Sequence, residues 1–323
     1  MEIFLKKIFF LLLPFSLIIV MEITFEFYPH TYNTKAKHLH NSMEEISILF
    51  IGTSHTQNAI NPEYIDQEAA NLGFAGQDLQ TSYALLENYI PKLSNLKYLG
   101  IEISYHSLEL KNRPDYWRNS FYYRFFDLEN LHPEHYQLKN EVLSLTNFHY
   151  FFKNFIRFIN PWNETKNYNE YGFPNSDIEG RFLRFQYGQD AIFNSYMNSK
   201  RIFRHSDTDI EAYRQNIHIV DKIINLAEDH NINIFFYDTP LYTTYRACMI
   251  REKLNRRDTM IDNLETDGFH FLNFSSCNNF SVKEYKDDDH LNSLGARRFT
   301  KMMNDSINLL DNRLLKTHTS NQP

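Results

Sequence analysis

One short apolar stretch that ends in Gly-Thr-Ser constrains the fold more than any other part of the chain. The stretch Ile46–Thr56 reads ISILFIGTSHT. An apolar run that ends in Gly-x-Ser predicts a buried parallel strand that turns sharply into a helix. Ser54 would then lie at the carboxyl end of the strand, where open α/β sheets bind ligands, with the free N–H groups of the helix directed at it. Taken alone, the stretch favours an ordinary turn over a nucleophile, and the case for chemistry depends on the other end of the chain.

Strand-like and helix-like patterns alternate along the rest of the chain. Four further strands are expected at Asn71–Phe74, Leu96–Ser104, Asn231–Tyr237 and Phe269–Phe274. Helices are expected at Leu79–Ile90, Thr208–His230 (with a capping box of Thr208 and Glu211), Tyr245–Leu264 and Ser293–Leu310. This alternation predicts an α/β protein, a three-layer α/β/α sandwich around a five-stranded parallel sheet. We expect the domain to cover residues 45–315.

The N-terminus has the layout of a signal anchor. Lys6 and Lys7 precede Ile8–Val20, which carries no charge. No small-x-small cleavage site follows, so residues 1–28 are expected to stay as a transmembrane helix, with residues 29–44 as a polar linker. The positive-inside rule would keep the lysines in the cytoplasm and place the domain on the extracytoplasmic side of the cytoplasmic membrane. The alternative is a buried N-terminal helix of a soluble protein.

Composition limits the number of domains, the kinds of partner and the kinds of structural site that the chain can have. The chain has 323 residues, enough for one large domain or two small ones, and a formal net charge of -7, which argues against nucleic acid as a partner. Two cysteines do not make a disulfide scaffold or a structural zinc site. Aromatic residues, Trp162 among them, gather at about 108–205, which we interpret as a helical insertion that either binds sugars by stacking or fills a core. Residues 316–323 are expected to form a disordered tail.

The run Asp287-Asp288-Asp289-His290 is the second stretch with chemical content. Acidic neighbours favour the charged imidazolium, and a carboxylate can fix which ring nitrogen carries the proton. Asp287 and His290 can reach one site across a turn, and His290 could then take a proton from Ser54. Taken by itself, the run favours a solvated acidic loop, or weak calcium coordination by clustered carboxylates, over a catalytic role. Zinc is not supported, because no second nearby histidine has ligand spacing.

The ordered set of these motifs resembles the SGNH (GDSL-like) hydrolase superfamily. The matching segments, in chain order, are Gly52-Thr53-Ser54, Asn71-Leu72-Gly73-Phe74-Ala75-Gly76 and Asp287-x-x-His290-Leu291-Asn292-x-x-Gly295-Ala296. The resemblance implies a flavodoxin-like three-layer fold with Ser54 as nucleophile, His290 as general base and Asp287 as the residue that orients the histidine. It also implies an oxyanion hole formed by the backbone N–H groups of Ser54 and Gly76.

Two blocks depart from the family pattern. The Gly-x-Asn-Asp block, which supplies an asparagine to the oxyanion hole, is absent, and the corresponding strand end reads Ile103-Ser104-Tyr105-His106. Either Ser104 or His106 is a possible substitute, with Asn292 as a further possible substrate contact; a packing role is the alternative for the first two. The first block reads Gly-Thr-Ser-His in place of Gly-Asp-Ser-Leu.

The anchor combined with these motifs is similar to a membrane-tethered, extracytoplasmic branch of the superfamily. That branch includes the D-alanyl-transfer protein of teichoic acid synthesis and the alginate O-acetyltransferases. The resemblance implies an acyltransferase or esterase that acts on O-acyl groups of a cell-envelope glycan, without cofactor or metal, and with a multispanning membrane acyltransferase as a possible partner. The alternative is a catalytically inactive envelope protein that keeps the fold and binds glycan or such a partner. A small metal-binding module using Asp287–Asp289 is a third hypothesis.

Overall fold

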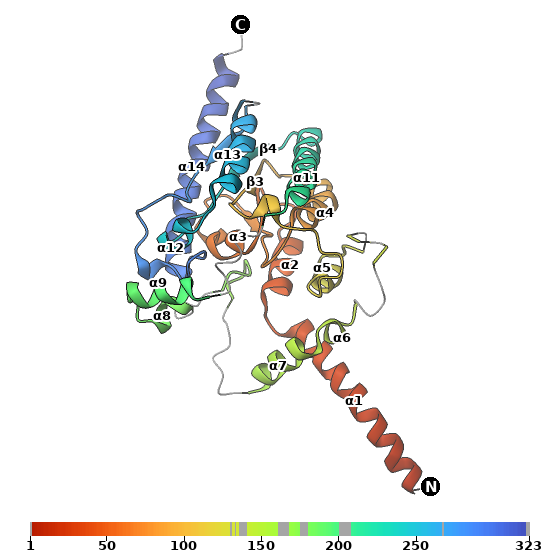
Figure 1. The fold of residues 1–323 in the computed structure, drawn as a ribbon. Helices are drawn as coiled ribbons and strands as arrows, with labels where there is room; N and C mark the ends of the chain where they lie inside the picture. The colour runs from red at the N-terminus through yellow and green to blue at the C-terminus, as the bar shows by residue number, and fades with distance from the viewer. Residues whose placement is uncertain are drawn as a thin grey trace. The chain divides into compact units, whose positions relative to one another are not determined.

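The structure is a computed structural model that describes residues 2–129, 131–132, 134–135, 141–160, 168–174, 180–199, 208–266 and 268–320. It divides into two compact units, one of residues 1–37 and 113–174 and one of residues 38–112 and 175–323 (Figure 1). The aromatic insertion expected at 108–205 is therefore shared between the units. Trp162 lies outside the described residues.

A five-stranded parallel sheet forms the centre of the second unit. Its strands are β1 (Ile48–Ile51), β2 (Ala69–Asn71), β3 (Tyr98–Glu102), β4 (Asn233–Tyr237) and β5 (His270–Leu272). Every neighbouring pair is parallel and the order is β2-β1-β3-β4-β5. This is the 2-1-3-4-5 order of flavodoxin-like sheets, so the predicted fold class is confirmed.

The second strand ends where the prediction started it. Asn71 is the last residue of β2; its side-chain NH₂ donates to the carbonyls of Thr56 and Ile60, and its Oδ1 accepts from Gly73 N. Of the segment predicted as a strand, Asn71–Phe74, only Asn71 belongs to β2. The chain beyond it still runs beside β1, because Leu72 N donates to Phe50 O and Phe74 N donates to Gly52 O, before the turn at residues 75–76.

Helices cover both faces of the sheet. Side chains of alternate strand positions, such as Phe50 and Tyr237, pack with Phe299 and Met303 of α14 (Ser293–Ser320). Figure 1 shows α14 on one side of β3 and β4, and α4 (Leu79–Tyr89) and α11 (Ile210–Asp229) on the other. The unit also contains α3 (Ser54–Ala59), η1 (Pro62–Tyr64), η2 (Ile90–Lys92), η3 (Ser107–Glu109), α8 (Arg181–Arg184), α9 (Gln189–Met197), α12 (Thr243–Ala247), α13 (Arg251–Thr266) and η6 (Val282–Glu284).

The first unit is helical and aromatic. It contains α1 (Glu2–Phe27), α5 (Asn119–Phe126), α6 (Leu143–Thr146) and α7 (Phe148–Ile159). Phe25 of α1 contacts Phe151 of α7 edge-on at a ring-centroid distance of 4.7 Å, and the ring of Phe121 lies 5.5 Å from that of Phe151. Within this unit the aromatic residues make a core, which is one of the two roles expected for them.

Several predicted boundaries differ from the observed ones. The expected linker contains a helix, α2 (Thr31–Asn41), whose Tyr32, Ala36 and Leu39 are buried at helical spacing; its polar composition hid this pattern. The cap of α11 is Asp209, which accepts from Ala212 N, and not Thr208. The helix predicted within Tyr245–Leu264 is α13, which ends two residues later, and the short α12 precedes it. Helix α14 continues through Ser320 into the expected tail.

A search of the described residues finds no individual helix with the length and apolar content to cross a membrane. A bent pair, Leu12–Phe27 with Thr31–Asn41 at 49°, meets those criteria jointly.

Candidate active site

The turn from β1 into α3 positions Ser54. Thr53 is the N-cap of α3, and its hydroxyl accepts a hydrogen bond from His55 N at 3.2 Å. Gly52 is required here because a Cβ atom at this position would meet the side chains of Thr56 and Glu102. The close approach leaves Ser54 as the first residue of the helix, at the carboxyl end of the strand as predicted.

A buried carboxylate binds this turn through hydrogen bonds. Glu102, the last residue of β3, is 1 % exposed. Its oxygens accept hydrogen bonds from the backbone N–H and the hydroxyl of Thr53, at 2.7 and 3.0 Å, and from those of Thr56, at 3.2 and 2.8 Å. Burial opposes its ionisation, but the facing His55 and these hydrogen bonds keep the pKa of Glu102 below its ordinary value.

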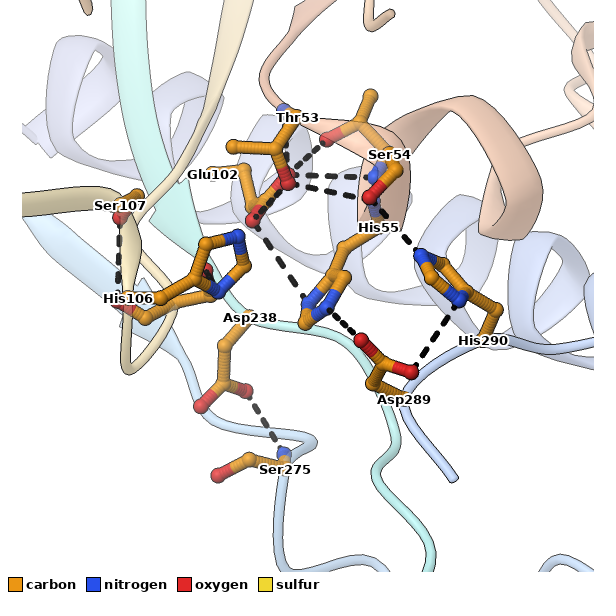
Figure 2. Close-up of polar contacts among 12 residues, drawn as sticks. Thr53, Ser54, His55, Glu102, His106, Ser107, Asp238, Ser275, Asp289 and His290 are labelled. Carbon is orange, nitrogen blue, oxygen red and sulfur yellow. Dashed lines mark hydrogen bonds and ion pairs between the residues drawn. The ribbon is translucent and has the colours of Figure 1, made fainter. Parts of the chain in front are cut away.

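The serine and the histidine predicted from opposite ends of the chain are in contact. His290 Nε2 lies 2.8 Å from Ser54 Oγ, and His290 Nδ1 lies 2.8 Å from Asp287 Oδ1. Asp289 Oδ1 approaches the same Nδ1 at 3.4 Å. Figure 2 shows the ring of His290 with one nitrogen toward Ser54 and the other toward Asp289. These distances give the hydroxyl–imidazole–carboxylate geometry of a nucleophile activated by a base.

A small closed loop presents the acidic run. Tyr285 and Leu291 pair in an antiparallel bridge, and Lys286 N donates to His290 O at 3.0 Å. Asp288 anchors the loop, since its carbonyl accepts from Tyr242 N at 3.0 Å and its carboxylate contacts Thr244 and Arg181. The loop therefore turns Asp288 away from the serine and turns Asp287 and Asp289 toward His290.

The two carboxylates set the charge of the imidazole. Burial lowers the pKa of His290, but the charges of Asp289 and Asp287 outweigh it and raise the pKa to about 9. In turn, despite their burial, the pKa of Asp287 is lowered and that of Asp289 lies well below its ordinary value, with His290 as the main favourable neighbour of each. At neutral pH the resting site therefore holds a protonated His290 whose Nδ1 faces two anionic carboxylates.

His55 extends this network to the sheet. The residue is 2 % exposed, with Nε2 at 3.9 Å from Asp289 Oδ2 and Nδ1 at 3.9 Å from Glu102 Oε1. Its ring lies edge-on to that of His290 at 5.3 Å. A row of charged and polar groups thus runs from Ser54 through His290, Asp289 and His55 to Glu102.

The predicted oxyanion groups lie on neighbouring elements. Among the described residues the N–H of Ser54 has no acceptor, while those of Thr53 and Thr56 are bound by Glu102. Gly76, with φ of +75°, lies in a turn closed by Phe74 O and Gln77 N. The side chain of Gln57 accepts from Ala75 N at 2.6 Å and so ties this turn to α3. The oxyanion role of the Gly76 N–H stays a prediction.

The proposed substitutes for the missing asparagine bind each other. Ser104 Oγ lies 3.1 Å from His106 Nδ1, and the ring of His106 lies 4.6 Å from that of His55. Burial is the main cause that lowers the pKa of His106 to about 3, so its imidazole is neutral. Asn292 caps α14 by accepting from Gly295 N, while its side-chain NH₂ donates to Lys283 O. The structure thus gives these three residues internal partners, and substrate contacts by them stay predictions.

Donor atoms of His55, Asp289 and His290 all lie within 4.8 Å of one another, a spacing that could hold a metal ion. Both ring nitrogens of His290, however, already face partners, Ser54 on one side and Asp287 with Asp289 on the other. A metal ligated by this imidazole would have to displace one of them. The geometry therefore favours the triad over a metal centre. It also disfavours the calcium hypothesis, because Asp288 binds Thr244 and Arg181 elsewhere.

Two residues of this network, Glu102 and His55, escaped the sequence analysis as contributors to the site. Glu102 had a detectable signal, since it is a charged residue inside the apolar strand pattern LKYLGIEIS. His55 had none, because a histidine after a turn serine gives no local hint of its partner. For Asp289, the acidic run predicted an effect on the imidazole of His290 but not which aspartates would make the contact. Their roles depend on contacts between segments that are far apart in the chain.

Comparison with known proteins adds little at the sequence level. No protein-family model matches the chain, and no curated protein is similar to it. Among solved structures it is similar to a protein assigned as an acylhydrolase from Bacteroides fragilis (10% identity, TM-score 0.41, covering 85% of this chain and 95% of that one). It is also similar to a protein assigned as a platelet activating factor from Streptococcus pneumonia (16% identity, TM-score 0.40, covering 92% and 97%). We draw no conclusion from likenesses this weak; the fold class rests on the strand order.

Proposed function

We propose that the chain is a serine-dependent acyl-ester enzyme that works through an acyl-enzyme on Ser54. The observation that carries the proposal is the pair of 2.8 Å contacts that join Ser54, His290 and Asp287 at the carboxyl edge of a flavodoxin-like sheet. A serine hydroxyl is a weak nucleophile unless a base takes its proton, and a base is effective only when a third group fixes its orientation. All three parts are present at hydrogen-bonding distance.

The geometry defines the role of each group. Ser54 Oγ attacks the acyl carbon while its proton passes to His290 Nε2, and the Nδ1–H of the imidazolium donates to Asp287. The N–H of Ser54 donates to the oxygen that becomes negative, a contribution of roughly 3 kcal/mol per donor in serine hydrolases. His290 then returns the proton to the leaving alcohol. Water or a second hydroxyl group resolves the acyl-enzyme, which gives hydrolysis or acyl transfer respectively.

The proposed setting is the extracytoplasmic face of a membrane, with an acylated envelope glycan as substrate. This part of the proposal is supported by the basic and apolar N-terminal sequence and by the apolar side chains that α1 exposes. A membrane acyltransferase is the partner that would supply acyl groups for transfer. Nucleic acid is not proposed as a partner, since the net charge is -7.

A fluorophosphonate probe tests the chemistry, because it reacts covalently with an activated serine. We expect labelling of the native chain, none of Ser54→Ala, and native labelling of the matched control Ser306→Ala, whose hydroxyl is bound to the carbonyl of Met302 on α14. Labelling of Ser54→Ala, or no labelling of the native chain from about pH 7 to 10, would count against the proposal.

A second candidate is a catalytically inactive member of the fold that binds glycan. The observation that favours it is the pairing of Ser104 with His106 at the strand end where the superfamily pattern has its asparagine. Glycan binding that is unchanged in Ser54→Ala and His290→Ala, together with the absence of probe labelling, would select this candidate.

A further inference from the structure

We propose that α7 (Phe148–Ile159) is an interfacial helix that lies in the surface of a lipid bilayer and inserts its exposed apolar side chains among the lipids. The inference rests on the membrane location in the proposed function and is independent of the serine chemistry. It assigns a second lipid contact to the first unit, in addition to α1.

The apolar stripe of α7 is wider than the surface that covers it. At about 100° per residue, the apolar side chains from Phe158 round to Ile156 span roughly 160° of the helix. Phe151 and Phe155 on one part of this stripe are buried. The other part is exposed: Phe148 by 47%, Phe152 by 37%, Ile156 by 45% and Ile159 by 56%.

The buried part of the stripe packs against α1 and the segment just after it. The ring of Phe25 lies 4.7 Å from that of Phe151 and 5.2 Å from that of Phe158, and Tyr28 stacks on Phe158 at 3.9 Å. Glu22 of α1 accepts hydrogen bonds from the first amides of α6, those of Leu143 and Ser144. The α6–α7 segment is therefore fixed to the C-terminal end of α1.

The rest of α1 exposes a long apolar surface that leads up to this end. Within the first unit, Figure 1 shows the N-terminal part of α1 extending beyond α6 and α7. Its exposed apolar side chains are Phe10, Leu12, Leu13, Phe15, Ile19, Val20 and Ile23. If this part lies in lipid, α7 is attached where the apolar surface of α1 ends, which is where a membrane-water interface would be.

The polar side of α7 has the charge expected at such an interface. Lys153 and Arg157 are exposed, and between Phe148 and Ile159 there is no acidic residue. An amphipathic helix with basic residues on one side and Phe or Ile on the other lies in the plane of the interface, with its apolar side about 5–10 Å deep. Basic residues near the surface add an attraction to anionic lipids. This pattern favours a lipid surface over a protein groove as the occupant.

Site-directed fluorescence on the full chain tests the proposal. An environment-sensitive fluorophore (NBD) is attached to single cysteines at Phe152→Cys and, on the polar side of the same helix, Asn154→Cys. The background is Cys248→Ser with Cys277→Ser, and a third label at Leu13→Cys reports on α1. Each protein is reconstituted into vesicles with anionic lipids that carry a nitroxide quencher either near the headgroup or near the end of the acyl chain.

We expect the label at Phe152→Cys to lose about half of its fluorescence to the shallow quencher and less to the deep one, because an interfacial helix sits near the headgroups. The label at Asn154→Cys should be quenched clearly less. Quenching at Leu13→Cys but not at Phe152→Cys would overturn this inference and leave the anchor standing. No quenching at either site would overturn both this inference and the proposed membrane anchor. A Phe152→Cys label that is blue-shifted in these vesicles but quenched by neither nitroxide lipid would place the side chain against protein and refute the lipid contact.

Discussion

Replacing Asp289 by asparagine should lower the pH at which Ser54 becomes reactive. Asp289 Oδ1 lies 3.4 Å from His290 Nδ1, whereas Asp287 Oδ1 makes the shorter contact of 2.8 Å. We infer that Asp289 acts mainly through its charge and that Asp287 mainly fixes the orientation of the ring. Asparagine keeps the size of the side chain and removes only the charge, so the variant separates the two effects.

The size of the effect follows from the raised pKa of His290. That pKa rises from 6.5 to about 9, although burial alone would lower it. A shift of one unit corresponds to about 1.4 kcal/mol, so the net preference for the charged imidazole is about 3 kcal/mol. Removing one of two nearby carboxylates should lower the pKa by about one to two units. Since about one imidazole in a hundred is neutral at pH 7 when the pKa is about 9, the variant should be labelled about ten- to fiftyfold faster at that pH.

The assay is the rate of fluorophosphonate labelling of Ser54 between roughly pH 6 and 10, with the fold checked by circular dichroism at each pH. The native chain should give a midpoint near 9 and Asp289→Asn a lower one, without a higher plateau. Asp287→Asn is the matched control: it should lower the plateau by roughly a thousandfold, because the ring loses the group that orients it. A midpoint unchanged in well-folded Asp289→Asn would refute the assigned role of its charge.

Three further changes test the supports of the site. His290→Gln should remove a contribution of about 3 kcal/mol to the free energy of unfolding. Because the pKa of His290 is raised in the folded chain, that contribution is present below pH 6.5 and is lost as pH rises through about 9. Chemical denaturation at several pH values measures it. Glu102→Gln should destabilise the chain by roughly 2–4 kcal/mol, because it weakens charge-assisted hydrogen bonds to the serine turn. The control Glu87→Gln changes an exposed side chain and should have little effect. Equal denaturation midpoints for the two variants would contradict this prediction. Gly52→Ala should lower both the melting temperature and the labelling of Ser54, since the new Cβ would lie 2.6 Å from Glu102 Cβ. The control Gly188→Ala should be tolerated, because the nearest atom to its new Cβ lies at 3.3 Å. A native melting temperature and native labelling in Gly52→Ala would count against the packing argument.

Local patterns were enough to predict the sheet. The five apolar runs between turn residues correspond to the five strands, and the run of β1 is apolar along its whole length because this strand is buried on both faces. The weakest strand prediction was the second, because it began at Asn71, which is the last residue of β2. Helix ends were also predicted imperfectly, as the cap at Asp209 shows, since neighbouring residues such as Thr208 have similar capping ability.

The sequence by itself determined the parallel α/β class and pointed to Ser54 and His290, two residues in short motifs that the structure brings into contact. It did so because periodicity and turn signals are local, and because a parallel sheet brings its carboxyl ends to one edge. Only the tertiary structure decided that Asp289 shares the imidazole with Asp287 and that Glu102 holds the serine turn. These assignments depend on the direction of side chains that meet across more than one segment of the chain, and no local pattern encodes that direction.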